Sequence, residues 1–140
     1  MLLSSGYTMP KMGFGTSSVL EPEVFYTAVK VGYRHFDTAT RYRNEEQLGE
    51  ALERCVSEKL VTREELFITT KLWHDDYKDP EAALRLSLQK LKVDYVDLYL
   101  IHWPLNGHSN KVPMHKLWAT MESFVDQGLV RSIGVSNFNI

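Results

Sequence analysis

The stretch Tyr95-Val96-Asp97-Leu98-Tyr99-Leu100-Ile101-His102-Trp103-Pro104 decides how the rest of the chain is interpreted. Its first part is apolar apart from Asp97 and rich in β-branched and aromatic residues, which predicts a strand buried on both faces of a parallel sheet. His102 follows this run directly, and Pro104 ends the strand. Because α/β enzymes place their chemistry at the carboxyl ends of such strands, His102 is a candidate functional residue.

Three other stretches repeat this arrangement, and their apolar runs end at Asp37, Lys71 and Ser136. The intervals are 34 residues from Asp37 to Lys71, 31 from Lys71 to His102, and 34 from His102 to Ser136. One strand–helix unit takes about 30 residues, so a polar residue returns once per unit at the same end of a strand. We therefore expect these four residues to lie on one rim of a parallel sheet.

The composition indicates one soluble domain with a moderate core, since 44% of the 140 residues are hydrophobic and the net charge is −2. The near-neutral balance and the absence of a basic stripe argue against nucleic-acid and membrane-surface partners. No apolar run approaches the length of a membrane span. The single cysteine, Cys55, and the lack of a signal peptide predict a cytoplasmic, reducing setting.

Alternating strands and helices with short connections are predicted along the whole chain. We expect strands over 12–16, 33–37, 66–71, 96–101 and 130–135, and helices over 21–31, 44–59, 79–91 and 115–127, with a polar loop over 105–113. Asn44 and Gln47 have the spacing of a helix cap with a reaching side chain. This order fits an open doubly wound sheet and also the first half of a (β/α)8 barrel.

Four motifs resemble the aldo-keto reductase family, in order and in spacing. They are Asp37-Thr38-Ala39 with Tyr42, Asn44-Glu45 and Gly49; Thr70-Lys71-Leu72-Trp73; Leu100-Ile101-His102-Trp103-Pro104; and Gly128 through Phe138. The resemblance implies an α/β (β/α)8 TIM barrel. Residues 1–140 would form its N-terminal half, strands one to five with four helices, and the chain would be truncated.

The resemblance also implies an activity, the NADPH-dependent reduction of a small aldehyde or ketone substrate, with NADH as the other possible cofactor and no metal. Tyr42 would donate the proton, Lys71 and Asp37 would modulate it, and His102 would orient the carbonyl. Two further sets follow from the same resemblance: cofactor-binding residues Gly15, Thr16, Asp37, Ser136 and Asn137, and substrate-pocket residues Ser17, Trp73 and Trp103. Ser17 stands where many family members have tryptophan.

These residue types suit that chemistry. A tyrosine hydroxyl holds its proton too tightly for acid catalysis near neutrality, and a nearby ammonium group favours the tyrosinate. Lys71 beside Asp37 could provide that ammonium group. A neutral His102 can donate an N–H to the carbonyl oxygen. The remaining histidines have no metal-ligand spacing; they are His35, His74, His108 and His115.

Two other functions stay open from the sequence. A half-barrel would leave its first and fifth strands as sheet edges, with inward apolar residues such as Phe36, Ile68 and Leu100 short of packing partners. A chain of this length would then need a partner or a second copy to close the sheet, and would act as an inactive structural or interaction module. A different barrel enzyme, such as a Schiff-base lyase that uses Lys71, is the weaker alternative.

Overall fold

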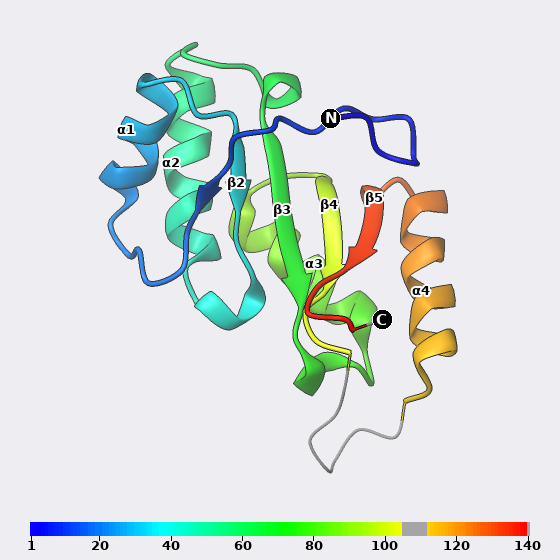
Figure 1. Cartoon of the computed structure of the whole chain (residues 1–140). Coiled ribbons are helices and arrows are strands. Elements are labelled where there is room, and N and C mark those ends of the chain that lie inside the picture. Colours follow the sequence, from blue (N-terminus) through cyan, green and yellow to red (C-terminus); the bar gives the residue numbers. More distant parts are fainter. Residues whose placement is uncertain (105–111, 140) are drawn as a thin grey trace.

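The computed structural model describes residues 1–104 and 112–139. Within them the structure has five parallel strands, and an α-helix lies between each strand and the next along the chain (Figure 1). The strands are β1 (Phe14–Gly15), β2 (His35–Asp37), β3 (Phe67–Leu72), β4 (Val96–Ile101) and β5 (Val130–Val135). The predicted strands are confirmed, with β1 and β2 shorter than expected. Most of the predicted loop over 105–113 lies outside the described residues.

The strand order confirms the barrel that the resemblance implied, over the open sheet that the strand–helix period alone also allowed. All neighbouring strands are parallel, and their order across the sheet is β1-β2-β3-β4-β5. A doubly wound sheet reverses its direction of winding near the middle, whereas a barrel adds each new strand beside the previous one. The uninterrupted order is that of a barrel, and the strands run side by side with the helices outside the curved sheet (Figure 1).

The four helices begin and end close to the predicted positions. They are α1 (Pro22–Lys30), α2 (Glu45–Ser57), α3 (Pro80–Leu91) and α4 (Met114–Asp126). The Asp79 carboxylate accepts a hydrogen bond from the backbone N–H of Ala82 at 3.1 Å, which caps α3. Gly32 and Gly128 follow α1 and α4 with φ of 108° and 74°, a conformation that favours glycine and ends a helix.

The described connections contain three short 3-10 helices, η1 (Thr40–Tyr42), η2 (Arg63–Glu65) and η3 (His74–Asp76). A capping box begins η2, because the side chains of Thr62 and Glu65 each bond to the other residue's backbone. The predicted side-chain cap at α2 is wrong. Asn44 occupies the N-cap position, but its side chain makes no capping bond, and the Gln47 side-chain oxygen is buried without a partner among the described residues.

The core lies between the outer face of the sheet and the helices. Phe36 and Ile68 are fully buried there and are paired in the sheet register, so the expectation that they point inward is wrong. The ring of Phe36 lies 5.9 Å from that of Phe14, which in turn contacts Phe25 of α1 edge-on at 6.2 Å. Leu100 does occupy the inner face, where a Cβ on Gly134 would lie 2.9 Å from its Cδ2 atom.

The amino end of the sheet holds an ionic cluster around Asp97. Its Oδ2 atom accepts from an Arg63 nitrogen at 2.8 Å and from the backbone N–H of Ile68 at 2.9 Å, and its Oδ1 atom lies 3.4 Å from an Arg131 nitrogen. The Tyr95 ring lies between the two guanidinium groups, 4.0 Å from that of Arg63 and 4.1 Å from that of Arg131. This Asp97 cluster joins β3, β4 and β5 at the end opposite the predicted rim.

Candidate active site

The structure brings the predicted catalytic residues together at the carboxyl end of the sheet. Asp37 ends β2, Lys71 lies near the end of β3, and His102 follows β4. Tyr42 ends η1, which belongs to the connection after β2. The parallel register aligns these strand ends, as the interval between the polar residues predicted.

Lys71 is the centre of the site. Its side chain is only 6% exposed, and Nζ donates to a carboxylate oxygen of Asp37, to the backbone carbonyl of Thr38 at 2.9 Å, and to the Tyr42 hydroxyl at 3.4 Å. An ammonium group has three hydrogens, and these three contacts use all of them. The arrangement places a buried positive charge directly against the Tyr42 hydroxyl.

His102 packs against the Tyr42 ring. The two ring centroids are 5.8 Å apart and nearly perpendicular, and the Nδ1 atom of His102 is buried without a hydrogen-bond partner among the described residues. Burial, and then the nearby charge of Lys71, lower the pKa of His102 below its ordinary value against the opposing effect of Asp37. The imidazole is therefore neutral near pH 7 and has one N–H to donate.

Ser136 and Asn137 come together directly after β5. The Asn137 amide nitrogen donates to the backbone carbonyl of His102 at 2.8 Å and to the Ser136 hydroxyl at 3.0 Å. Asn137 has a φ of 60°, a left-handed conformation that asparagine tolerates better than most residues. This pair therefore fixes the backbone at His102, a role that the sequence did not predict, and Asn137 itself remains exposed.

The residues after β1 lie beside Asp37. Gly15 pairs with Asp37 in the sheet, and a Cβ on Gly15 would meet nothing within 4 Å. The backbone N–H of Thr16 donates to the Asp37 carbonyl at 3.0 Å. Thr16 is fully buried, while Ser17 is exposed. Gly15 thus leaves open space at the rim, and the Thr16 hydroxyl is enclosed by protein.

The two predicted pocket tryptophans differ in their surroundings. Trp73 is half-buried and lies edge-on to His102, with centroids 5.3 Å apart. Trp103 is 44% exposed, and its backbone carbonyl accepts a hydrogen bond from the buried hydroxyl of Tyr77. Tyr77 was not predicted, and an aromatic residue in a connecting loop carries no signal of such an anchoring role.

Arg41 is another residue of the site that sequence reasoning missed. Its guanidinium group lies 5.5 Å from the Trp73 ring centre. A cavity of about 420 Å³ opens beside it and is lined by both arginines that flank Tyr42 in sequence, Arg41 and Arg43, together with Trp73 and His74. The sequence did offer a signal for Arg41, because it is adjacent to Tyr42, the candidate proton donor.

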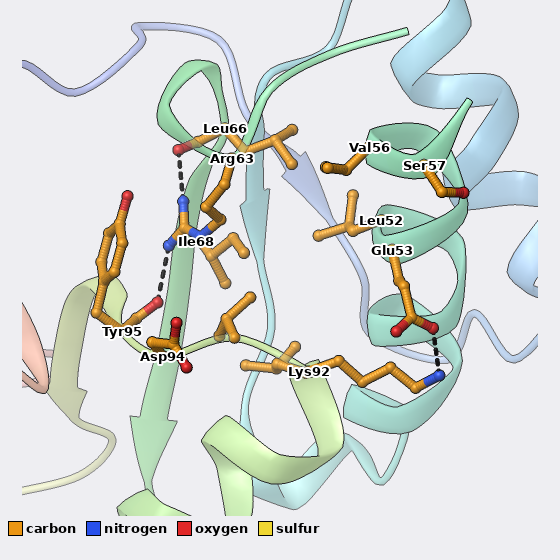
Figure 2. A pocket seen from close by; sticks show the side chains of 12 residues that line it. Leu52, Glu53, Val56, Ser57, Arg63, Leu66, Ile68, Lys92, Asp94 and Tyr95 are labelled. Carbon is orange, nitrogen blue, oxygen red and sulfur yellow. Dashed lines mark hydrogen bonds and ion pairs between the residues drawn. The ribbon is translucent and has the colours of Figure 1, made fainter. Parts of the chain in front are cut away.

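A second cavity, of about 350 Å³, lies far from this chemistry (Figure 2). It opens between α2 and the end of α3, with the apolar side chains of Leu52, Val56 and Ile68 facing it and an ion pair between Lys92 and Glu53 at its margin (Figure 2). Its lining includes residues at the start of β3 and just before β4, so it belongs to the amino end of the sheet. The contacts among Asp37, Tyr42 and Lys71 lie at the other end of the sheet.

The described part of the chain holds neither a metal-binding cluster nor a membrane-spanning helix. Residues 1–104 and 112–139 contain no group of three or more histidine, cysteine or acidic side chains placed to hold a metal ion. None of their helices combines the length and the apolar character needed to cross a membrane. Cys55 is fully buried in the core, and burial raises the pKa of its thiol, as expected for a packing residue.

Comparison with known proteins agrees with this geometry. The model of the aldo/keto reductase family matches residues 12–140. The chain is 49% identical to the methylglyoxal reductase DkgA of Yersinia pestis, over 99% of this chain and 48% of that protein. It is 41% identical to the NAD(P)H-dependent D-xylose reductase I,II of Candida tropicalis, over 97% of this chain and 50% of that protein.

A solved structure shows the same likeness in three dimensions. The aldo-keto reductase of Bombyx mori in complex with NADP superposes with a TM-score of 0.93 at 42% identity, covering 99% of this chain and 50% of that one. The five strands and their helices thus match the N-terminal half of such a barrel. The chain spans about half the length of the relatives it matches. On its motifs, its fold and these likenesses together, the chain belongs to the aldo/keto reductase family.

Proposed function

We propose that this chain provides the acid–base residues of an NADPH-dependent reductase that converts a small aldehyde or ketone to an alcohol, with Tyr42 as the proton donor. The observation that carries the proposal is the contact of the buried Lys71 ammonium group with the Tyr42 hydroxyl. A cation at this distance stabilises the tyrosinate that forms when the proton leaves. The Asp37 carboxylate pairs with Lys71 and so offsets part of the desolvation penalty of burying the ammonium group.

His102 would hold the substrate carbonyl. As a neutral imidazole it can donate one hydrogen bond to the carbonyl oxygen, and it lies against the Tyr42 ring from which the proton comes. Both donors then point at one oxygen atom. The Trp73 ring packs nearly perpendicular to His102 and limits the space beside it.

The residues around this pair fit a nicotinamide cofactor. A carboxamide needs a donor and an acceptor together, and the exposed Asn137 and its neighbour Ser136 present a side-chain carbonyl and a hydroxyl at the end of β5. Gly15 leaves open space on the β1 side of Asp37 for close approach of a ligand. When bound, the reduced cofactor supplies the hydride that the carbonyl carbon receives.

The contacts of Lys71 argue against the Schiff-base alternative. A lysine that attacks a carbonyl carbon must present a free amine lone pair. Here all three hydrogens of an ammonium group have acceptors, and one of these is the carboxylate of Asp37. The same contacts support a role in which the charge of Lys71 acts on Tyr42.

The relatives suggest the first substrates to test. They include reductases named for methylglyoxal and for D-xylose, and one relative from Candida parapsilosis is named as NADH-dependent. Methylglyoxal and D-xylose, each with NADPH and with NADH, therefore form the starting panel. The decrease of cofactor absorbance measures turnover.

The test of the proposal is Tyr42→Phe in the complete natural protein. We expect kcat to fall by about 10²- to 10⁴-fold, the range for loss of a general acid, while the Kd for NADPH stays within about twofold. Tyr33→Phe is the matched control, because Tyr33 packs against Phe14 outside the rim and should keep full activity. Retained turnover in Tyr42→Phe would refute the acid role. A wild-type protein inactive across the panel would instead favour the structural or interaction module.

A further inference from the structure

Asn44 has an unusual environment for a residue at the start of a helix. It is fully buried, and its side chain makes no capping bond to α2. Helix N-caps normally use such a side chain for the helix itself. The amide of Asn44 must therefore be held by other partners, and these identify what it does.

The amide of Asn44 bonds to three groups outside α2. Its nitrogen donates to the backbone carbonyls of Thr16 at 2.6 Å and Val19 at 2.8 Å, and its oxygen accepts from the Thr38 hydroxyl at 3.0 Å. Two segments are joined in this way, the loop after β1 and the connection after β2. Both N–H groups of the amide and one of the two lone pairs of its oxygen are therefore used, and the side chain is closed to water.

The Tyr42 segment, residues 38–44, is closed at its base by this contact. Thr38 and Asn44 are its two ends, and the bond between their side chains joins them. Within the segment, the backbone N–H groups of Tyr42 and Arg43 bond to Ala39 and Thr40 at 3.0 and 3.2 Å. Arg43 has a φ of 56°, a conformation that a non-glycine residue adopts only when its surroundings impose it.

The same segment touches the catalytic lysine at two points. The Thr38 carbonyl and the Tyr42 hydroxyl both accept from Lys71, at 2.9 and 3.4 Å. The Tyr42 hydroxyl therefore keeps its position only if the base of the segment holds its shape. A shift of about 1 Å at a catalytic group is enough to cost roughly 100-fold in rate.

We infer that Asn44 is a positioning residue, which locks the Tyr42 segment to the loop after β1 and so holds the Tyr42 hydroxyl against Lys71. The expected effect on the rate rests on the proposed function. The hydrogen bonds of Asn44 that lock the segment do not depend on that function. Asn44 touches neither substrate nor cofactor; it acts through Tyr42.

The first test is Asn44→Ala and Asn44→Asp in the complete natural protein. The aspartate keeps the shape and the acceptor but removes the two donated bonds, leaving a carboxylate oxygen against two carbonyl oxygens. We expect kcat to fall at least tenfold per folded molecule in both variants, with KM for the carbonyl substrate changed less than threefold. Thr38→Val removes only the third bond and should lower kcat by a smaller factor.

Asp79→Ala is the control at another helix start, since it deletes the exposed side-chain cap of α3, away from the Tyr42 segment. It should lower the Tm, by less than Asn44→Ala because only one exposed bond is lost, and leave kcat per folded molecule unchanged. A merely structural role for Asn44 would make both variants behave alike. Equal kcat in Asn44→Asp and wild type would overturn the inference.

Hydrogen exchange gives a second measurement that needs no activity. In Asn44→Ala the amides of residues 41–43 should exchange at least tenfold faster than in wild type, while in Asp79→Ala they should not change. Unchanged exchange in Asn44→Ala would overturn the inference even if kcat fell. Faster exchange in a protein whose wild type has no reductase activity would support the inference and refute the proposed function, so the two failures can be distinguished.

Discussion

The two ends of this sheet each hold a carboxylate paired with basic side chains, but their burial is inverted. At the amino end the anion is buried, since the Asp97 side chain is 3% exposed and those of Arg63 and Arg131 are 18% and 32% exposed. At the carboxyl end the cation is buried, since the Lys71 side chain is 6% exposed and that of Asp37 is 39% exposed.

The inversion separates a structural cluster from a chemical one. Buried Asp97 accepts from a backbone N–H of the neighbouring strand, so its charge organises the sheet. Buried Lys71 instead contacts the Tyr42 hydroxyl, which is the proton donor in the proposed function. Which partner is buried, and what it faces, therefore distinguishes the two clusters better than the presence of an ion pair does.

The largest effect should come from removing the buried cation. Lys71→Met keeps the length of the side chain but removes the charge beside Tyr42, and we expect kcat of the complete protein to fall about 10³-fold, or about 4 kcal/mol in the activation free energy. Lys92→Met, which removes an exposed ion pair with Glu53, is the control and should retain full kcat. Comparable activity in the two variants would contradict the distinction between the ends of the sheet.

The opposite result is expected at the amino end. Asp97→Ala leaves two guanidinium groups and the Ile68 N–H without their acceptor, and should lower the free energy of unfolding by about 3 kcal/mol while kcat per folded molecule is unchanged. Arg131→Met removes the longer, more exposed contact with Asp97 and the contact with the Tyr95 ring, and should cost only about 1 kcal/mol. Urea titrations followed by circular dichroism measure both. A fall in kcat for folded Asp97→Ala would mean that this cluster also serves catalysis.

The smallest effect is a pH dependence confined to the rim. The pKa of His102 is lowered in the folded state, so on acidification the unfolded chain binds a proton first and stability falls as the pH drops below about 6.5. His102→Gln should therefore show a shallower loss of stability between pH 7 and pH 5. Comparing this variant with wild type cancels the other titrating groups, including His35, whose pKa burial also lowers, and Glu45, whose pKa burial raises. Parallel curves for the two proteins would contradict this prediction.

Much of the site could be predicted because its signal is a sequence interval. Asp37, Lys71, His102 and Ser136 each follow an apolar run, and parallel strands bring such positions to one end of a sheet. The four helices and the Thr62–Glu65 capping box were also predictable, since they depend on residues close in sequence.

The predictions that failed were those in which a residue's environment is set by groups distant in the sequence. Asn44 has the sequence of a helix cap, but its amide bonds to the loop after β1, 25 and 28 residues away. Phe36 and Ile68 were assigned to the inner face, because a strand buried on both faces shows no alternation that would reveal its orientation. No short-range pattern could have shown either fact.

The sequence alone determined the order of strands and helices, the residues that end each strand, and the chemical types available at the rim, because these follow from hydrophobic runs and from the covalent spacing of the chain. Only the tertiary structure decided that the strands add in one direction, which partner of each ion pair is buried, and that Asn44 holds the Tyr42 segment. These features depend on which distant groups share a low-dielectric environment, and that is set by packing of the whole sheet against its helices.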